Sequence, residues 1–329
     1  MKIPRRALIA GAISGAVAMM LSSLCMAAAA ADAYPSRPIR IIVPTAPGAG
    51  SDVVSRLLAS RLTEALGQQV VADNRAGAAG NIGAEIASRA TPDGYTLLMA
   101  NLQQIIGALL FDKLPFDLIR DFSPICLMNT GSYVLVINPS VAATSVAELI
   151  ALAKSKPGAL HYGSGGTGGV PHLAAEMLKT MAGVNLAHVP YKSVVFGLVD
   201  VAGGQIQLAF SVMPAAMPMI KQGKLRALGV TSLKRSPLAP ELETLAETIP
   251  GYEVIGWNGL VAPLKTPDSI IARLNAESNK AWKSAEIRDK LHGLGLEPVG
   301  TTQREFAAFM LAQREKMRKT IEAAGLRSK

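Results

Sequence analysis

The sequence predicts an α/β protein of two domains, in which mostly parallel sheets are covered by helices. From residue 39 onward, short apolar segments typical of buried strands alternate with longer segments whose apolar residues recur at the helical period. The chain has 329 residues, of which 50% are apolar and 17% charged, so it can fill two cores. Alternating strands and helices favour parallel sheets, because a crossover between parallel strands needs a helix-sized connection.

The first unit shows the pattern. Residues 39–43 are mainly apolar, residues 47–51 form a glycine turn, and residues 52–66 carry leucine and valine at helical spacing. The same reasoning predicts further strands at 70–72, 95–99, 133–137, 160–162, 206–210, 225–230 and 254–261, and helices at 82–89 and 173–182.

The end of the chain is predicted to be helical. Thr266 and Pro267 resemble an N-cap followed by proline at the first helical position, and Thr302 and Glu305 have capping-box spacing. The sequence contains no flexible linker after residue 33, so two domains imply that the chain crosses between them more than once.

Residues 1–33 are predicted to be a secretory signal. Lys2, Arg5 and Arg6 form a positive start, an apolar stretch follows, and the small residues at the end contain an A-x-A pattern that ends at Ala33. We therefore expect export with cleavage near Ala33, or after Ala31. An N-terminal membrane anchor is the alternative, although the glycines, serines and alanines of the stretch make a weak one.

The mature chain stays basic. The chain has 33 basic and 24 acidic residues. Three of the basic residues and one of the acidic residues lie in the predicted signal, so the mature chain has a net charge of +7. Export and the scattered positions of these residues argue against a nucleic-acid partner, whereas a positive field favours capture of anions. Cys126 is the one cysteine left after cleavage, so no intramolecular disulfide can form.

Two glycine turns are candidate anion sites. Residues 163–168 match G-x-G-x-x-G between a strand and a helix, but residues 180–188 lack the acidic residue that a dinucleotide site requires, so NAD is rejected. The turn at residues 47–52 is the second. Both place backbone N–H groups at a helix N-terminus, which suits a carboxylate. Each turn could instead serve only the backbone geometry or cap its helix.

No catalytic set is recognisable. The sequence has no G-x-S-x-G elbow, no H-E-x-x-H motif, no Walker loop and no cysteine pair. His172 with Glu176 could ligate a metal in principle, but two ligands make a poor site, so we expect no metal and no cofactor. An enzyme that uses His172 as a base is the rival hypothesis, and it lacks a partner group for that histidine. Trp257 is interpreted as core or hinge packing.

Together, seven segments resemble one family, the receptors of tripartite tricarboxylate transporters, also called Bug-type periplasmic binding proteins. The resemblance covers essentially the whole mature chain. The segments are Tyr34-Pro-x-Arg-Pro-Ile39, Val43-Pro-x-x-Pro-Gly48, Asn74-Arg-x-Gly-Ala-x-Gly-Asn-Ile-Gly83, Pro92-Asp-Gly-Tyr-Thr-Leu97, His188-Val-Pro-Tyr-Lys192, Gly203-Gly-Gln205 and Gly223-Lys-Leu-Arg-Ala-Leu228.

The resemblance implies a two-lobed periplasmic binding protein fold of type II, with two strands crossing between the lobes near residues 133–139 and 252–261. Lobe 1 would comprise 34–136 plus 256–329, and lobe 2 would comprise 137–255. It also implies a periplasmic monomer without enzymatic activity, which binds a small organic acid and delivers it to the membrane components of a tripartite transporter. A sensory receptor for the same ligand is the alternative.

The resemblance further implies which residues face the ligand. They come from the two glycine turns, from the segment after the 95–99 strand and from single positions in lobe 2: Thr45, Gly48, Ala49, Gly50, Ser51, Asp52, Asn101, Gln103, Ser164, Gly165, Thr167, Gly168, His172, Tyr191 and Ser211. The sequence departs from the family pattern at four positions. Glycine is commoner at Ser193 and proline at Phe196. Serine or threonine is commoner at Gly169, and aspartate at Ser211. These departures concern the ligand rather than the fold.

Overall fold

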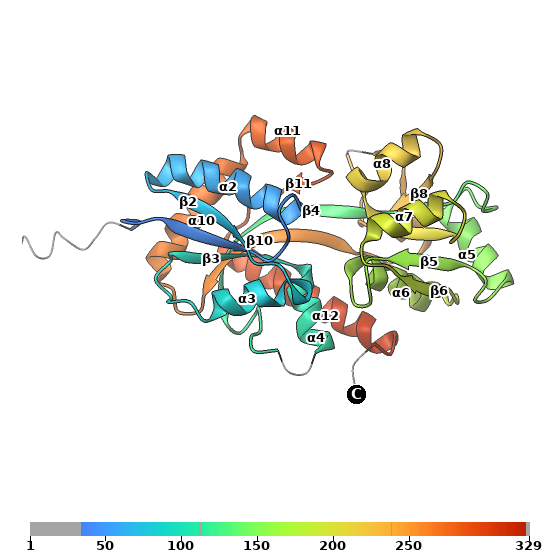
Figure 1. Ribbon diagram of the computed structural model, residues 1–329, viewed down its shortest axis with the longest axis horizontal. Helices are drawn as coiled ribbons and strands as arrows, with labels where there is room; N and C mark the ends of the chain where they lie inside the picture. Colours follow the sequence, from blue (N-terminus) through green and yellow to red (C-terminus); the bar gives the residue numbers. More distant parts are fainter. Residues whose placement is uncertain (1–33, 112–113, 238, 327–329) are drawn as a thin grey trace, which may run out of the picture.

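The computed structural model describes residues 34–111, 114–237 and 239–326, so the predicted signal at residues 1–33 lies outside the described residues. Two lobes lie side by side, and two long strands, β4 (Phe122–Ile137) and β10 (Ile255–Pro263), run between them (Figure 1). Strands and helices alternate along most of the chain, which confirms the α/β class.

The left lobe of Figure 1 contains the N-terminal and C-terminal thirds of the chain. Its other elements are β1 (Ile39–Val43), α2 (Gly50–Leu66), β2 (Val70–Asn74), η1 (Ala78–Gly80), α3 (Asn81–Ser88), β3 (Thr96–Asn101), α4 (Leu102–Leu110), α10 (Asp268–Trp282), α11 (Ala285–Gly293), β11 (Glu297–Pro298) and α12 (Gln303–Ala323).

The right lobe contains the middle of the chain. Its elements are α5 (Val146–Ser155), β5 (His161–Ser164), α6 (Val170–Ala182), β6 (Ala187–Pro190), α7 (Val194–Ala202), β7 (Leu208–Val212), α8 (Met213–Lys221), β8 (Arg226–Val230), β9 (Glu243–Thr244) and α9 (Leu245–Thr248).

The prediction of mostly parallel sheets is wrong for the two crossing strands. β1 pairs in parallel with β2 and β3, and β5 pairs in parallel with β6 and β7. Every pairing of β4 or β10 is antiparallel, including their pairing with each other. The physical reason is connectivity, because a strand that brings the chain back to the first lobe runs opposite to the strand that left it.

β4 is longer than the predicted strand at 133–137, because it already begins at Phe122. The part of β4 before Tyr133 contains Pro124 and Gly131, residue types that are uncommon inside strands. The pairing with β10 shifts register at Ile125, next to Pro124, and at Met128, as a β-bulge does, whereas Gly131 pairs regularly with Gly256. β4 exchanges its partner β10 for β7 and β8 between Ser132 and Tyr133. The limits of the two domains stay a prediction.

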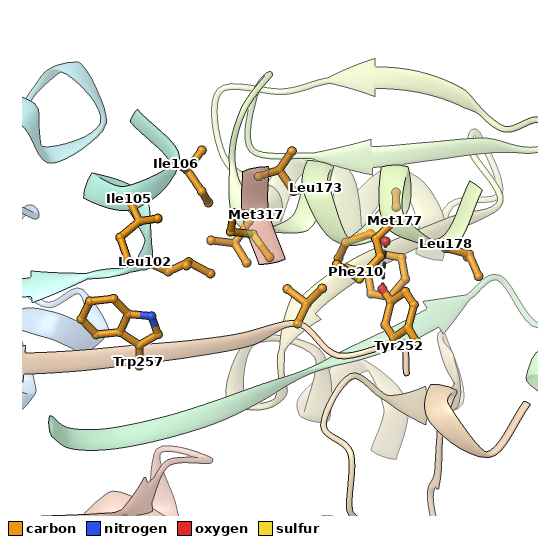
Figure 2. Packing of buried hydrophobic residues seen from close by; sticks show 14 of the residues in the cluster. Leu102, Ile105, Ile106, Leu173, Met177, Leu178, Phe210, Tyr252, Trp257 and Met317 are labelled. Carbon is orange, nitrogen blue, oxygen red and sulfur yellow. Dashed lines mark hydrogen bonds between the residues drawn. The ribbon is translucent and has the colours of Figure 1, made fainter. Parts of the chain in front are cut away.

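One hydrophobic core continues through both lobes, and two further clusters lie in one lobe each. Figure 2 shows the continuous core: Met317 of α12 lies between Leu102 of α4 on one side and Leu173 of α6 on the other. Helix α12 therefore packs against elements of both lobes. Trp257 is 2% exposed in this core, as expected of a packing residue, but it also lines the cavity described below, which the interpretation of Trp257 from the sequence did not include.

In the described part of the chain, we find no helix with the length and apolar character needed to cross a membrane.

Candidate functional site

A cavity of about 890 Å³ lies between the lobes, above the crossing strands. The first lobe contributes the turn before α2, the segment from Asn101 to Gln103 and the turn at Leu294–Leu296. The second lobe contributes the turn before α6 and the start of α8, and β4 and β10 form the floor. No lysine, arginine, aspartate, glutamate or histidine is among the residues that line it in the described part of the chain.

Four α-helices begin at this cavity without a side-chain cap. They are α2, α3, α6 and α8, whose N-cap residues are Ala49, Gly80, Gly169 and Val212. Helix α3 follows η1 directly, so the N–H of its first residue already has an acceptor in Ala78 O, which leaves the starts of α2, α6 and α8. Of the helices that begin elsewhere, α5, α7, α11 and α12 have serine or threonine caps that accept a backbone N–H, whereas α10 has none. The first N–H groups of a helix have no partner within the helix and carry a partial positive charge. The three uncapped helix starts can therefore bind an anion.

Nine of the fifteen residues predicted from the sequence line the cavity. They are Thr45, Gly48, Ala49, Gly50, Ser51, Asn101 and Gln103 from the first lobe and Gly165 and Thr167 from the second. Both glycine turns thus face the same space, although more than a hundred residues separate them. The carboxyl ends of parallel strands bring them there, as is usual in open α/β sheets.

A network of polar side chains crosses the floor and includes residues that the sequence did not indicate. Ser51 Oγ donates to Asn258 Oδ1, and Asn258 Nδ2 donates to Asn129 Oδ1 at 3.2 Å. Asn101 caps α4 and also donates from Nδ2 to Ser51 Oγ at 3.4 Å. Asn129 and Asn258 come from the middle of the two crossing strands, where no local motif marks them.

Asn129 has a further donor. Its Nδ2 is buried and has no hydrogen-bond partner in the described structure, and the same holds for Thr45 Oγ1 and Trp257 Nε1. All three residues line the cavity. A buried donor without an acceptor costs about 1–3 kcal/mol, so a ligand that accepts from Asn129 and Trp257 would recover part of that cost. Five further side-chain atoms of this kind lie outside the cavity lining in the described structure.

The other six predicted residues lie behind the lining. Asp52 is 3% exposed and accepts from Gly48 N at 2.8 Å, Arg56 Nε at 3.0 Å and Asn74 Nδ2 at 2.9 Å. Burial alone would raise the pKa of Asp52, but these three hydrogen bonds and the Arg56 charge outweigh burial and lower it. The carboxylate therefore organises the first turn from within.

Three of the six shape the second lobe. Tyr191 donates its hydroxyl to Asp200 at 2.6 Å, and burial together with this bond raises the pKa of Tyr191 to about 12. Ser211 is fully buried and its Oγ contacts the C=O of Val212, which lines the cavity in its place. Gly168, with φ at +79°, accepts Gln103 Nε2 across the cleft at 3.3 Å.

The remaining two residues belong to a histidine cluster. Ser164 Oγ lies 2.7 Å from His188 Nε2, and His172 Nδ1 accepts Gly168 N at 3.1 Å. Neither histidine lines the cavity: His172 is buried in the second lobe and His188 is half-buried there. Among the described residues no group of three or more histidine, cysteine or acidic side chains could hold a metal ion.

Comparison with known proteins gives consistent matches. The model of the tripartite tricarboxylate transporter family receptor matches residues 54–326. A UPF0065 protein in the tcbD-tcbE intergenic region of a Pseudomonas species is 35% identical over 321 residues, which cover 97% of this chain and 94% of that protein. Protein BugT of Bordetella pertussis is 33% identical over 302 residues, which cover 91% of this chain and 93% of BugT.

Solved structures agree. The structure of R. palustris Rpa4515 with adipate is 34% identical with a TM-score of 0.78, and the match covers 89% of this chain and 99% of that chain. MatC from Rhodopseudomonas palustris with bound malate is 27% identical with a TM-score of 0.74, and the match covers 88% of this chain and 100% of MatC.

Proposed function

Because this chain belongs to the tripartite tricarboxylate transporter receptor family, we propose that it is an exported receptor that captures a small carboxylate in its cleft and delivers it to the membrane components of a tripartite transporter. Members of the family are solute-binding receptors and not enzymes. The observation that carries the proposal is the cleft: the uncapped N-termini of α2, α6 and α8 lie at it, and no charged side chain lines it in the described part of the chain.

This lining suits an anion that is held by backbone groups. Each helix N-terminus is equivalent to roughly half a positive charge, which favours a carboxylate and disfavours a cation. Trp257, Tyr133, Val212 and Leu296 supply apolar walls for the body of the ligand. Two similar proteins have solved structures with adipate and with malate, and both of these ligands carry carboxylates. No cofactor enters the proposal.

Within this proposal the predicted residues divide into two groups. The nine that line the cavity contact the ligand, together with Asn129 and Asn258 of the floor. Asp52, Ser164, Gly168, His172, Tyr191 and Ser211 support the lining from behind. The receptor acts as a monomer in the periplasm, where its partner is the membrane part of the transporter.

A thermal-shift screen of the mature protein tests the ligand class. Adipate, malate, glutamate and ATP serve as probes for a dicarboxylate, a hydroxy acid, an amino acid and a nucleotide. A ligand at about 100 times its dissociation constant should stabilise the fold by about 2.7 kcal/mol. We expect at least one carboxylate without an amine to raise the melting temperature. A shift with ATP and with none of the carboxylates would refute the proposal.

A further inference from the structure

Two stacked imidazoles lie directly behind the second glycine turn of the cleft. The ring centroids of His172 and His188 are 4.2 Å apart, and the ring of Tyr162 stacks on His188 at 4.8 Å. The pairing of β5 with β6 sets Tyr162 opposite His188. The side chain of His172 is 3% exposed, so it cannot touch a ligand in the cavity.

Each histidine holds one part of the turn. His172 is the third residue of α6, and its Nδ1 accepts the N–H of Gly168, just before the N-cap. The side chain thus reaches back as the glutamate of a capping box does. His188 Nε2 lies 2.7 Å from Ser164 Oγ, which also contacts the N–H and the C=O of Gly166. Between these anchors, Gly165 and Thr167 line the cavity.

The contacts of His172 define its tautomer. An acceptor at Nδ1 requires that the proton of the neutral ring sits on Nε2. Glu176 Oε1 lies 3.9 Å from Nε2 and favours the proton there. The carboxylate is itself held by the hydroxyl of Tyr162 at 2.6 Å and by Lys179 Nζ at 2.7 Å. A second proton would therefore have to go to Nδ1, where it would face the Gly168 N–H, donor against donor.

The surroundings keep the ring neutral at pH 7. Burial, followed by the neighbouring His188, lowers the pKa of His172 to about 4, with Glu176 opposing and Lys179 assisting. Burial also lowers the pKa of His188. Tyr162 completes the titratable groups that face His172 from β5, β6 and α6. Helix α4 contains no titratable residue, and α12 brings Met317 to this side (Figure 2).

We propose that neutral His172 and His188 are positioning residues for the ligand, which hold residues 164–168 in the binding conformation, and that protonation of His172 releases Gly168 and weakens binding. The proposal rests on the proposed function, since it takes the cleft as the ligand site. Gly168 also carries the hydrogen bond from Gln103 across the cleft. Acid would therefore loosen both the turn and one contact between the lobes.

The test compares the mature wild-type protein with His172→Asn and His172→Phe by calorimetry, with adipate as the probe. Asparagine keeps an acceptor near the position of Nδ1 and does not titrate, whereas phenylalanine fills the space without an acceptor. At pH 7.5 we expect His172→Asn to bind within about threefold of wild type and His172→Phe to bind about three- to tenfold more weakly, the size of one lost hydrogen bond.

From pH 7.5 to pH 3.5 the wild type should lose about fourfold more affinity than His172→Asn, because a ring with a pKa of about 4 is about three-quarters protonated at pH 3.5. The titration of adipate and of His188 affects both proteins, so the difference between them reports His172. If the affinities of the wild type and of His172→Asn depend on pH in the same way, the proposal is overturned. This comparison does not need His172→Phe, so it still tests the proposal if that variant does not fold. A residue that is only part of the core would change the melting temperature in His172→Phe and leave the affinity at the wild-type value.

Amide hydrogen exchange over residues 164–172 of the unliganded protein gives a readout that needs no ligand. Exchange should be faster in His172→Phe and unchanged in His172→Asn at pH 7.5. Wild-type exchange in His172→Phe would overturn the positioning role. If adipate fails to bind even the wild type, the choice of ligand in the proposed function is what fails, and the exchange experiment still decides the role of the histidine.

Discussion

Asp52→Asn should destabilise the protein and weaken ligand binding together, because the Asp52 carboxylate holds the first glycine turn from within. Its Oδ2 accepts from Gly48 N and Arg56 Nε, and its Oδ1 accepts from Asn74 Nδ2. In asparagine one of these two oxygens becomes an NH₂ group, which must face a donor in either orientation.

The magnitude follows from the bonds that are lost. A hydrogen bond to a charged group contributes about 1.5–3 kcal/mol. Loss of one such bond, with a weaker neutral acceptor for the others, predicts a decrease of about 2–4 kcal/mol in the free energy of unfolding. At about 2–4 °C per kcal/mol, the melting temperature should fall by about 4–16 °C. Because Gly48 and Ser51 of this turn line the cavity, the affinity for a carboxylate should fall at least about tenfold.

The dependence on pH has a definite sign. The pKa of Asp52 is lowered in the folded protein, so its contribution is complete above the unfolded value of about 3.9 and is lost as the pH falls below it. The difference in stability between wild type and Asp52→Asn should therefore be constant near neutral pH and should shrink below about pH 4.

Denaturant unfolding from pH 7 to pH 3, together with calorimetry of ligand binding, checks this prediction. Asp73→Asn is the matched control, since Asp73 also pairs with arginines but lies outside the cavity lining and is partly exposed. Surface pairs contribute about 0–1 kcal/mol, so the control should stay close to wild type. If Asp52→Asn binds the ligand with wild-type affinity and has the same melting temperature as Asp73→Asn, the carboxylate does not organise the turn.

Two further substitutions probe the contact between the lobes and the second lobe. Gln103→Ala removes the hydrogen bond to Gly168 O across the cleft and should weaken ligand binding about two- to tenfold in calorimetry; unchanged affinity would show that this contact is absent from the bound form. Ser211→Asp places a carboxylate where the serine is fully buried, so unfolding in denaturant should show a loss of at least about 3 kcal/mol. Wild-type stability would instead mean that position 211 reaches the cleft, as the sequence predicted.

Local sequence patterns predicted the helices and strands whose conformation depends mainly on their own residues. The strand at residues 39–43, the helix that follows it and the capping box at Thr302 all appear as expected. The strand β6 and the first half of β4 were not predicted. β6 has four residues, two of them histidine and proline, and β4 contains Pro124 and Gly131. Both are strands because neighbouring strands pair with them, which no local pattern records.

The residues of the candidate site also fall into those that local sequence patterns predict and those that only the fold brings together. Both glycine turns could be predicted, because glycine, serine and aspartate between a strand and a helix have a strong local meaning. Asn129, Trp257 and Asn258 could not, because the middle of a strand gives no sign of which residues will meet a partner from the other lobe. His172 was recognised as a site residue, yet the fold directs its ring into the lobe, where Gly168 and Glu176 surround it.

The sequence by itself determined the α/β class, the position of the two anion-binding turns and the family, since these depend on periodicity, on glycine and capping residues at strand ends, and on combined short segments. The tertiary structure alone decided the antiparallel crossing of β4 and β10, the uncharged lining of the cleft and the division between residues that face it and residues that support it. These properties depend on which side chains meet across the lobes, and contacts between distant segments exist only once the chain has folded.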